Sequence, residues 1–482
     1  MNRYKIKQEF LRIFKPVLLL AVLLTSGITY SQSDSIRYDI TLSGISSTGQ
    51  YAPFWLQNRH YGKTSTQPAS AGLLVGIYKD FGSQKKVFDY GFKANGLVRT
   101  DKTKTDFYFH ELYAKARLFA FDFVVGAREE QFGNQDSTLS GGGLLFSQNA
   151  RPMPKVTIGI ERFTAVPFSR GYLEIKGALS HGWFTDNTYT TGMLLQHKYV
   201  YLRVGGKLPV HFQYGADHVA QWGGNVPGRG AQPSGLTDYL TVFKGGHGGT
   251  DANLGDQINA LGNHIFSQSL RLDVDISDFK LGAYWQNISE DGPIRIIGNT
   301  MNSPDGLWGI SLRNAHFPFV KGILYEYLNT TDQSGPFHDK DGIVYGGSDG
   351  YFYNGIYKSG WTYYSRTIGT PFITSPVYNA NGSVQTLNNR VQVQHIGLEG
   401  DICNYQYRML TSFSKNYGFS GDPIGKMKPE TSVLLEVNKV FPKLANVELG
   451  CAVGADFGQM YGNSVGVQLS VRKRGDLFCK KK

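Results

Sequence analysis

Apolar and polar residues alternate with a period of two in two segments near the C-terminus, residues 447–454 and 465–472. This period predicts β-strands, because successive side chains of a strand point to opposite faces. The turn-rich stretch 456–463 joins the segments, so together they predict a β-hairpin. Branched apolar residues on one face and small or polar residues on the other are typical of a barrel wall between lipid and a polar lumen. A half-buried soluble sheet has the same local pattern, so the rest of the chain decides.

The same alternation recurs along most of the chain, for example at 88–94, 270–276, 279–286 and 360–368. We count roughly sixteen to eighteen such segments of about 9–11 residues, the length that crosses a bilayer when tilted. Short turns alternate with long loops, of which the longest is 221–261. A secreted β-propeller, the alternative, would repeat one blade about every 40–50 residues with a recurring signature, and the sequence has none. The pattern therefore favours an all-β fold, a single large antiparallel transmembrane barrel with a polar lumen.

The first 31 residues have the pattern of a secretory signal peptide. Basic residues precede a short apolar core at 17–24, and small residues at 29–31 offer a cleavage site. An uncleaved membrane anchor is the alternative, but a spanning helix needs about 18 or more apolar residues. We therefore predict export, with the barrel in the outer membrane of a Gram-negative-type envelope.

Beyond the signal peptide the sequence contains no Pro/Ser-rich linker, no charge block and no shift in composition. The 29 Tyr, 30 Phe and 59 Gly favour β structure with many turns over separate helical domains. We expect a strand and loop region at 32–65, for which a periplasmic position is one option, followed by the barrel at 66–482.

The formal charge is +11, and removal of the signal peptide lowers it to +7, spread along the chain. Such a charge does not indicate nucleic-acid binding but suits acidic polysaccharide or anionic lipid headgroups. The three cysteines, Cys403, Cys451 and Cys479, are odd in number and irregularly spaced, so they predict no disulfide framework. Their spacing does not match a metal site either, and we predict neither a metal nor another cofactor.

Catalytic signatures are absent from the sequence: there is no H-E-x-x-H, no G-x-S-x-G and no phosphate-binding loop. One acidic set, Glu290 and Asp291 with Asp305, has the residue types that glycoside hydrolysis needs, since that reaction uses two carboxylates at a set separation. Loop carboxylates are more often turn formers or polar groups of a lumen. A surface glycoside hydrolase therefore stays an alternative to a non-enzymatic function.

Several loops combine aromatic residues with amides and charges, the residue types that bind sugars: rings cover the apolar face of a pyranose, and polar groups bond its hydroxyls. The candidate polysaccharide-binding residues are Trp55, Asn58, Arg59, Gln221, Trp222, Asp349, Tyr351, Tyr353 and Asn354. The alternative for each ring is a place in the aromatic girdle of a barrel.

Colinear motifs between residues 50 and 473 resemble the signature segments of the Wzi-type capsule assembly family. They include Pro53-Phe-Trp-Leu-Gln-Asn-Arg-His-Tyr-Gly62, Asn149-Ala-Arg-Pro-Met-Pro154, Gln257-Ile-Asn-Ala-Leu-Gly-Asn-His264, Glu290-Asp-Gly292, Asp305-Gly-Leu-Trp-Gly309, Glu326-Tyr-Leu-Asn-Thr-Thr-Asp-Gln-Ser-Gly335 and Asn388-Asn-Arg390. The resemblance implies an outer-membrane barrel of about eighteen strands that holds secreted polysaccharide at the cell surface as a lectin does. Relatives can carry helices at the periplasmic mouth, which the short strand-like chain before Pro53 argues against.

The resemblance carries over no catalytic residue. We expect lumen or structural roles for the motif residues Asn149, Arg151, Glu290, Asp291, Asp305, Glu326, Asn389 and Arg390. Arg151 and Arg390 are candidate ion-pair partners in the lumen, and Asp305 with Gly306 is a candidate turn.

We therefore predict a monomeric barrel, in contact with outer-membrane lipid, that binds capsular or extracellular polysaccharide without chemistry. Two alternatives stay open: a sugar or solute porin, which needs an open lumen, and the hydrolase.

Overall fold

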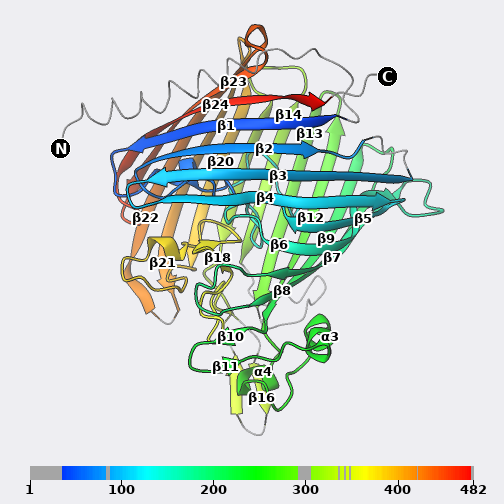
Figure 1. Cartoon of the computed structure of the whole chain (residues 1–482), viewed down its shortest axis with the longest axis vertical. Helices are drawn as coiled ribbons and strands as arrows, with labels where there is room; N and C mark the ends of the chain where they lie inside the picture. The colour runs from blue at the N-terminus through cyan, green and yellow to red at the C-terminus, as the bar shows by residue number, and fades with distance from the viewer. Residues whose placement is uncertain are drawn as a thin grey trace.

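The computed structural model describes residues 35–82, 87–290, 305–334, 337–340, 343–346, 349–420 and 422–478. It contains an 18-stranded closed antiparallel sheet, in which each wall strand pairs with the next along the chain and β1 pairs with β24 (Figure 1). The wall strands are β1 (Ile36–Ser47), β2 (Ala69–Lys79), β3 (Phe88–Asp101), β4 (Thr105–Leu118), β5 (Phe121–Ala127), β6 (Pro154–Ala165), β7 (Leu173–Trp183), β8 (Leu194–Val204), β9 (Val210–Trp222), β12 (Asn263–Ile276), β13 (Phe279–Glu290), β14 (Gly306–Asn314), β15 (Gly322–Asn329), β20 (Val391–Ile402), β21 (Tyr405–Phe419), β22 (Asp422–Phe441), β23 (Val447–Gly458) and β24 (Ser464–Phe478). The all-β barrel predicted from the sequence is confirmed.

Shorter elements lie in the connections between wall strands. They are α2 (Phe54–Gln57), β10 (Asn225–Val226), β11 (Gly230–Ala231), α3 (Leu236–Lys244), α4 (Leu254–Ile258), β16 (Phe337–Lys340), β17 (Ile343–Gly346), β18 (Thr362–Tyr363), β19 (Arg366–Thr367), η1 (Pro376–Tyr378) and η2 (Pro442–Leu444). Within the described ranges, none of the helices has the length and apolar character needed to cross a bilayer.

The wall follows the period-two pattern because alternate side chains meet different surroundings. On β5, Phe121, Phe123 and Val125 are exposed on the outer face, whereas Asp122 and Val124 are buried inside. The outward apolar side chains provide the surface that a bilayer solvates, and the hydrogen-bonded closed wall leaves no strand edge in the hydrocarbon.

The two ends of the barrel differ in the length of their connections. Both described chain ends, residues 35 and 478, lie at the end that carries short turns such as 119–120 and 403–404. The longest connections lie at the other end: 48–68, 128–153, 223–262 and 330–390. In outer-membrane barrels short turns face the periplasm and long loops face the medium, which orients this barrel.

Two boundaries drawn from the sequence differ in the structure. Residues 36–47 of the expected strand and loop region belong to the barrel wall, because they form β1, which pairs with both β2 and β24. Residues 360–368 form no wall strand; they contain the small β18–β19 hairpin, which lies inside the barrel. The signal peptide, Asp291 and Cys479 lie outside the described residues.

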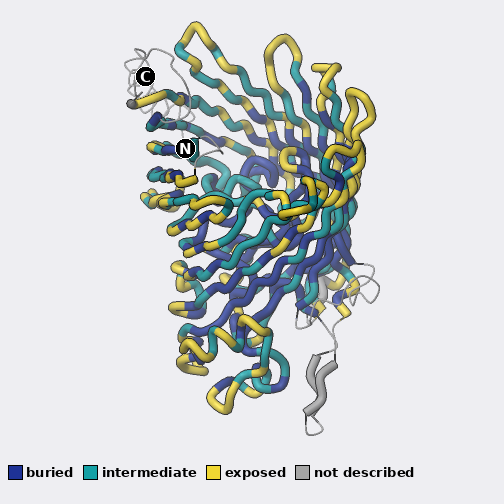
Figure 2. Tube along the Cα trace, turned by 90° about the vertical axis from the view of Figure 1, so that its right-hand side faces the viewer, coloured by how far each residue is buried: buried dark blue, intermediate teal, exposed yellow. Residues whose placement is uncertain are grey.

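The lumen is polar along the wall, as predicted, and its charges are paired between neighbouring strands. Such pairs include Lys79–Asp89, Lys93–Glu111, Arg117–Asp122, Arg203–Glu174, Arg408–Glu436 and Arg472–Asp39. The buried residues concentrate within the barrel and the exposed ones at turns and on the outer face (Figure 2). The middle of the lumen is not polar throughout, because long loops fold into it and bring an apolar core with them.

Candidate functional site

Three long loops fold into the barrel and pack on one another; we call residues 48–68, 128–153 and 349–390 the plug. The fully buried Trp361 donates a hydrogen bond from Nε1 to the carbonyl of Leu145 at 2.8 Å. The Tyr61 N–H donates to the Gln148 carbonyl at 2.7 Å, which joins the first loop to the second. Apolar side chains from all three loops share one buried cluster. The plug is therefore a folded unit and not three separate loops.

One buried glutamate of the wall holds the second plug loop. The carboxylate of Glu326, on β15, accepts hydrogen bonds from the Gly141 N–H at 2.7 Å and the Ser140 hydroxyl at 2.6 Å. A third donor, the Tyr284 hydroxyl of β13, lies 2.5 Å from the same carboxylate. Hydrogen bonds to a charged group in a buried site are the strong ones, so Glu326 is a main anchor of the plug.

Other wall strands anchor the plug from different sides of the lumen. Arg313 on β14 contacts Asp136 of the second loop through two nitrogens, with Nη2 at 2.7 Å from the carboxylate. Asp456 on β23 accepts a hydrogen bond from the Phe54 N–H at 2.7 Å, at the start of α2. Because β14 and β23 lie apart in the wall, the plug crosses the lumen between them.

Two motif residues lie where the second and third plug loops meet. Asn149 is buried and donates to the Thr367 carbonyl at 3.2 Å. The guanidinium of Arg151 lies between two tyrosine rings, 3.9 Å from the centroid of Tyr108 and 3.6 Å from that of Tyr364. The contacts described for Arg151 are thus cation–π contacts, and the ion-pair role for which it is a candidate stays a prediction.

Two further motif residues hold the end of the third plug loop. Asn389 donates to the Tyr351 carbonyl at 2.9 Å, and Arg390 donates from Nη2 to the Thr331 carbonyl at 3.0 Å. The contacts that the structure describes for Arg390 are therefore to backbone, and an ion-pair role for it stays a prediction. Both residues satisfy loop carbonyls that the fold withdraws from water.

The acidic residues considered for hydrolysis bind loop backbone. Glu290 accepts a hydrogen bond from the Phe352 N–H at 2.5 Å. Asp305 accepts from the N–H groups of Asp332 and Gln333, each at 3.0 Å. Burial raises the pKa of Asp305, although these two donors oppose the shift. These contacts match the alternative drawn from the sequence, in which loop carboxylates are turn formers and lumen polar groups.

The predicted polysaccharide-binding residues divide by exposure. Six are buried: Trp55, Asn58, Gln221, Trp222, Asp349 and Tyr351. Three are partly exposed: Arg59, Tyr353 and Asn354. The nine do not form one cluster, since Trp222 lies on the outer face of the wall whereas Trp55 lies in the plug. Their role in binding stays a prediction.

Sequence reasoning missed loop tyrosines that are at least partly exposed and lie beside a cationic side chain. Tyr364 is exposed beside Arg151, and the Nζ of Lys358 lies 5.8 Å from the ring centroid of Tyr189. Both tyrosines lie at the end with long loops. Their signal in the sequence is weak, because each pair joins residues far apart in the chain.

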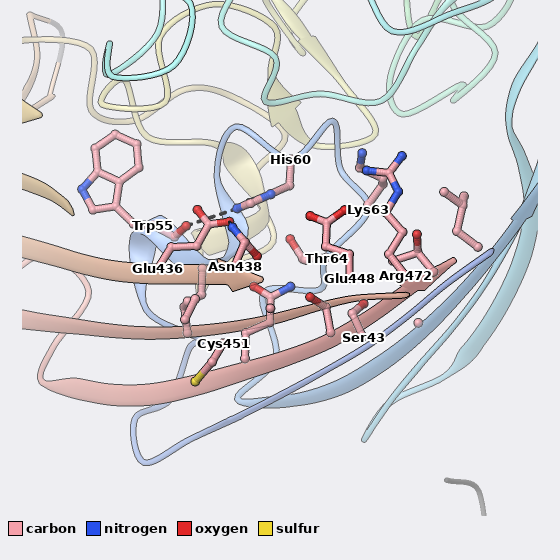
Figure 3. Close-up of a pocket in the computed structure, with 18 of the residues that line it drawn as sticks. Ser43, Trp55, His60, Lys63, Thr64, Glu436, Asn438, Glu448, Cys451 and Arg472 are labelled. Carbon is pink, nitrogen blue, oxygen red and sulfur yellow. Dashed lines mark hydrogen bonds between the residues drawn. The ribbon is translucent and has the colours of Figure 1, made fainter. Parts of the chain in front are cut away.

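A cavity of about 250 Å³ lies on the periplasmic side of the first plug loop, against β1, β2 and β22–β24 (Figure 3). Charged side chains line it, among them Lys63, Glu448 and Arg472. His60 also faces this cavity, and burial together with the charge of Arg408 lowers its pKa to about 4. His60 is therefore neutral at pH 7.

Comparisons with known proteins agree with this architecture. The family model for the capsule assembly protein Wzi matches residues 44–395. The structure is similar to that of Wzi from Escherichia coli, an outer membrane protein involved in group 1 capsule assembly and described as a carbohydrate-binding β-barrel. The TM-score is 0.59 at 14% identity, over 92% of this chain and 85% of that one.

A second similar structure is OccK5 (OpdH) of Pseudomonas aeruginosa, with a TM-score of 0.50 at 8% identity over 94% of this chain and 100% of that one. At these identities the two likenesses show the fold alone. No curated protein sequence matches the chain.

Proposed function

The chain belongs to the Wzi capsule assembly family, and on that premise we propose that it binds capsular or extracellular polysaccharide outside the cell and holds it there without covalent chemistry. It is an outer-membrane β-barrel whose long loops face the medium. The observation that supports the proposal most is the plug, because it joins those loops into one rigid surface across the lumen.

We place the polysaccharide contacts on the partly exposed aromatic and polar residues of the long loops. Tyr364 beside Arg151 and Tyr189 beside Lys358 combine an aromatic ring with a cation, a combination suited to a sugar that carries a carboxylate. Tyr353, already a candidate from the sequence, stacks on Phe419 with ring centroids 5.5 Å apart. The buried candidates, such as Trp55 and Tyr351, would act by holding these loops in place.

The proposed mechanism is multivalent attachment. A long polymer presents the same sugar many times, so each weak contact raises the effective concentration of the next sugar at its neighbouring contact. Loops fixed by the plug lose little conformational entropy on binding, which favours affinity. A wall closed by the strands of one chain needs no second copy, and we propose that the barrel acts as a monomer.

The test is the partition of polymer between cells and medium in a strain that lacks the gene and is complemented with variants. The double variant Tyr189→Ala/Tyr364→Ala removes two loop rings. The matched control is Tyr405→Ala, because Tyr405 is an exposed tyrosine with the Nζ of Lys439 3.7 Å from its ring centroid, at the periplasmic end.

We expect deletion to move polymer from cells to medium without changing total synthesis, and we expect wild type and Tyr405→Ala to restore retention. The Tyr189→Ala/Tyr364→Ala protein should restore less. An unchanged distribution in the deletion strain contradicts the attachment function. Equal retention by both variants, with both barrels folded, contradicts the placement of the contacts.

Two further measurements separate the proposal from the alternatives. A porin would conduct ions steadily in a planar bilayer, whereas we expect the plugged barrel to stay closed. A hydrolase would shorten purified polymer, whereas we expect its length distribution to stay unchanged during incubation with the protein.

A further inference from the structure

The connection 223–262, which we call the lobe, packs in large part on the outside of the barrel, where Val242, Ala252 and Leu261 share a buried cluster with Trp222. Its first residues contact the plug instead, because Val226 belongs to the buried cluster of the plug. Trp222 lies on the outer face of β9 together with the exposed Val210 and Phe212, because every second residue of a strand points to the same face. Its neighbour Gln221 points inward and donates to the Gly360 carbonyl of the plug at 2.9 Å. The lobe buries the Trp222 side chain, so it covers the extracellular part of the outer wall.

Helix α3 of the lobe lies directly against this outer face. Val242 of α3 is buried in one cluster with Trp222. The ring of Tyr239, also on α3, lies 5.8 Å from that of Trp222 and 5.8 Å from that of His181 on β7. Lys198 of β8 donates to a carbonyl near the end of the helix. One flank of α3 is therefore docked on the wall.

The adjacent flank of α3 is apolar and uncovered. The relative exposures of the residues Leu236, Leu240 and Phe243 are 78%, 50% and 37%. Their spacing, i, i+4 and i+7, puts them on one stripe of the helix. Thr237 and Lys244 lie on the side of the helix that faces away from the wall, opposite Tyr239 and Val242. We call the three apolar residues the α3 stripe.

The outer wall under the lobe has polar residues where lipid would be expected. Gln196 of β8, His218 of β9 and His264 of β12 lie on the outer face, and all three are buried. The two histidines hydrogen-bond each other at 2.8 Å. Polar side chains on the lipid face of a barrel are costly, so the lobe separates these groups from acyl chains.

We propose that α3 is an interfacial helix whose stripe inserts into the outer leaflet of the membrane. Lipid is the partner that fits the stripe, because the stripe adjoins the lipid-facing band of the wall. The face of β8 against which α3 docks continues along the strand into the exposed Val200 and Leu202. A helix held at the corner between wall and membrane, with one apolar flank on each, is the arrangement of an amphipathic interfacial helix.

The test measures the depth of single labelled positions in the reconstituted full-length protein. Cys403, Cys451 and Cys479 are first replaced by serine or alanine. Leu240→Cys then carries an environment-sensitive nitrobenzoxadiazole label in the stripe, and the matched control Thr237→Cys carries it on the polar side of the same helix.

A second stripe variant, Leu236→Cys, guards against loss of folding at residue 240, and heat-modifiable gel mobility reports the folded barrel. The protein that retains only Cys451 supplies the lipid reference, because Cys451 is exposed on the outer face of β23. Vesicles are made of phosphatidylcholine with or without brominated acyl chains.

We expect blue-shifted emission at both stripe positions and bromine quenching at least about twofold greater than at residue 237. Water-like emission without quenching at the stripe overturns the proposal. A blue shift without bromine quenching also overturns it, since that result means a protein surface, such as a second copy, covers the stripe.

Discussion

Replacement of Glu326 by alanine should release the second plug loop from the wall. The carboxylate accepts three hydrogen bonds at 2.5–2.7 Å, from the Ser140 hydroxyl, the Gly141 N–H and the Tyr284 hydroxyl. A hydrogen bond to a charged group contributes about 1.5–3 kcal/mol, and a donor left unsatisfied in a buried site costs about 1–3 kcal/mol. The three bonds are not additive, so we expect a loss of about 4 kcal/mol in the free energy of plug docking.

That loss translates into a large change in the population of undocked plug. At about 1.4 kcal/mol per factor of ten, the ratio of undocked to docked protein rises roughly 10³-fold. The barrel itself should survive, because its wall is held by interstrand hydrogen bonds that the substitution leaves in place. The expected phenotype is a folded barrel with an intermittently open lumen.

Single-channel conductance in a planar bilayer measures this directly, with hydrogen exchange of residues 128–153 as a second readout. The matched control is Glu174→Ala. Glu174 also faces the lumen, but it pairs with Arg203 of the neighbouring strand at 2.6 Å and not with the plug. Openings in Glu326→Ala that are absent from Glu174→Ala support the reasoning. Identical conductance and identical exchange in wild type and Glu326→Ala would refute it.

Three further outcomes test the plug. Trp361→Ala should lower the free energy of plug docking by about 3–5 kcal/mol, because the side chain is fully buried and donates a hydrogen bond to the Leu145 carbonyl. Limited proteolysis measures the resulting exposure of the plug loops. Gly360→Ala should also loosen the plug, because a Cβ added at Gly360 meets the backbone carbonyl of Phe352. The same digestion checks this, with Gly382→Ala as control, because Gly382 shares a positive φ, +71° against +61°, but has no atom within 4 Å of an added Cβ. Acid should loosen the first plug loop between pH 6.5 and 4. The docked state lowers the pKa of His60 from its usual 6.5 to about 4, so in this pH range the undocked loop binds a proton more readily than the docked loop. The free energy of docking therefore becomes less favourable as the pH falls from 6.5 through about 4. A His60→Gln protein should lose this part of the pH dependence of proteolysis, and an unchanged pH profile would count against it.

The wall was predictable because the alternation of apolar and polar residues within each strand is visible in its own sequence. Residues 270–276 and 279–286 alternate in sequence and form β12 and β13, and 447–454 with 465–472 form β23 and β24. The segment 360–368 misled the prediction because its aromatic residues and threonines have strand propensity, whereas the buried surroundings of the plug decide its structure. Local pattern cannot distinguish a strand in the wall from a short hairpin inside it.

The plug was not predictable for a different reason. Its contacts join residues far apart in the chain, as between Trp361 and Leu145, and its apolar residues follow no period. The aromatic residues singled out for sugar binding, such as Trp55 and Tyr351, have the same composition signature whether they face a polymer or a packed core. The motifs that resemble the family include Glu326 and Asn149, but the contacts of these residues with the plug come from the structure alone.

The pairing of β1 with β24 has a consequence for how the protein is made. These strands are separated by more than four hundred residues, so the contact that closes the wall has the largest entropy cost of loop closure and forms most slowly. Until it forms, the sheet has two unpaired edges, which readily pair with other chains. The first plug loop also waits for this stage, because Phe54 docks on Asp456 of β23. A chain cut before β24 would therefore give an open, aggregation-prone sheet and not a smaller barrel.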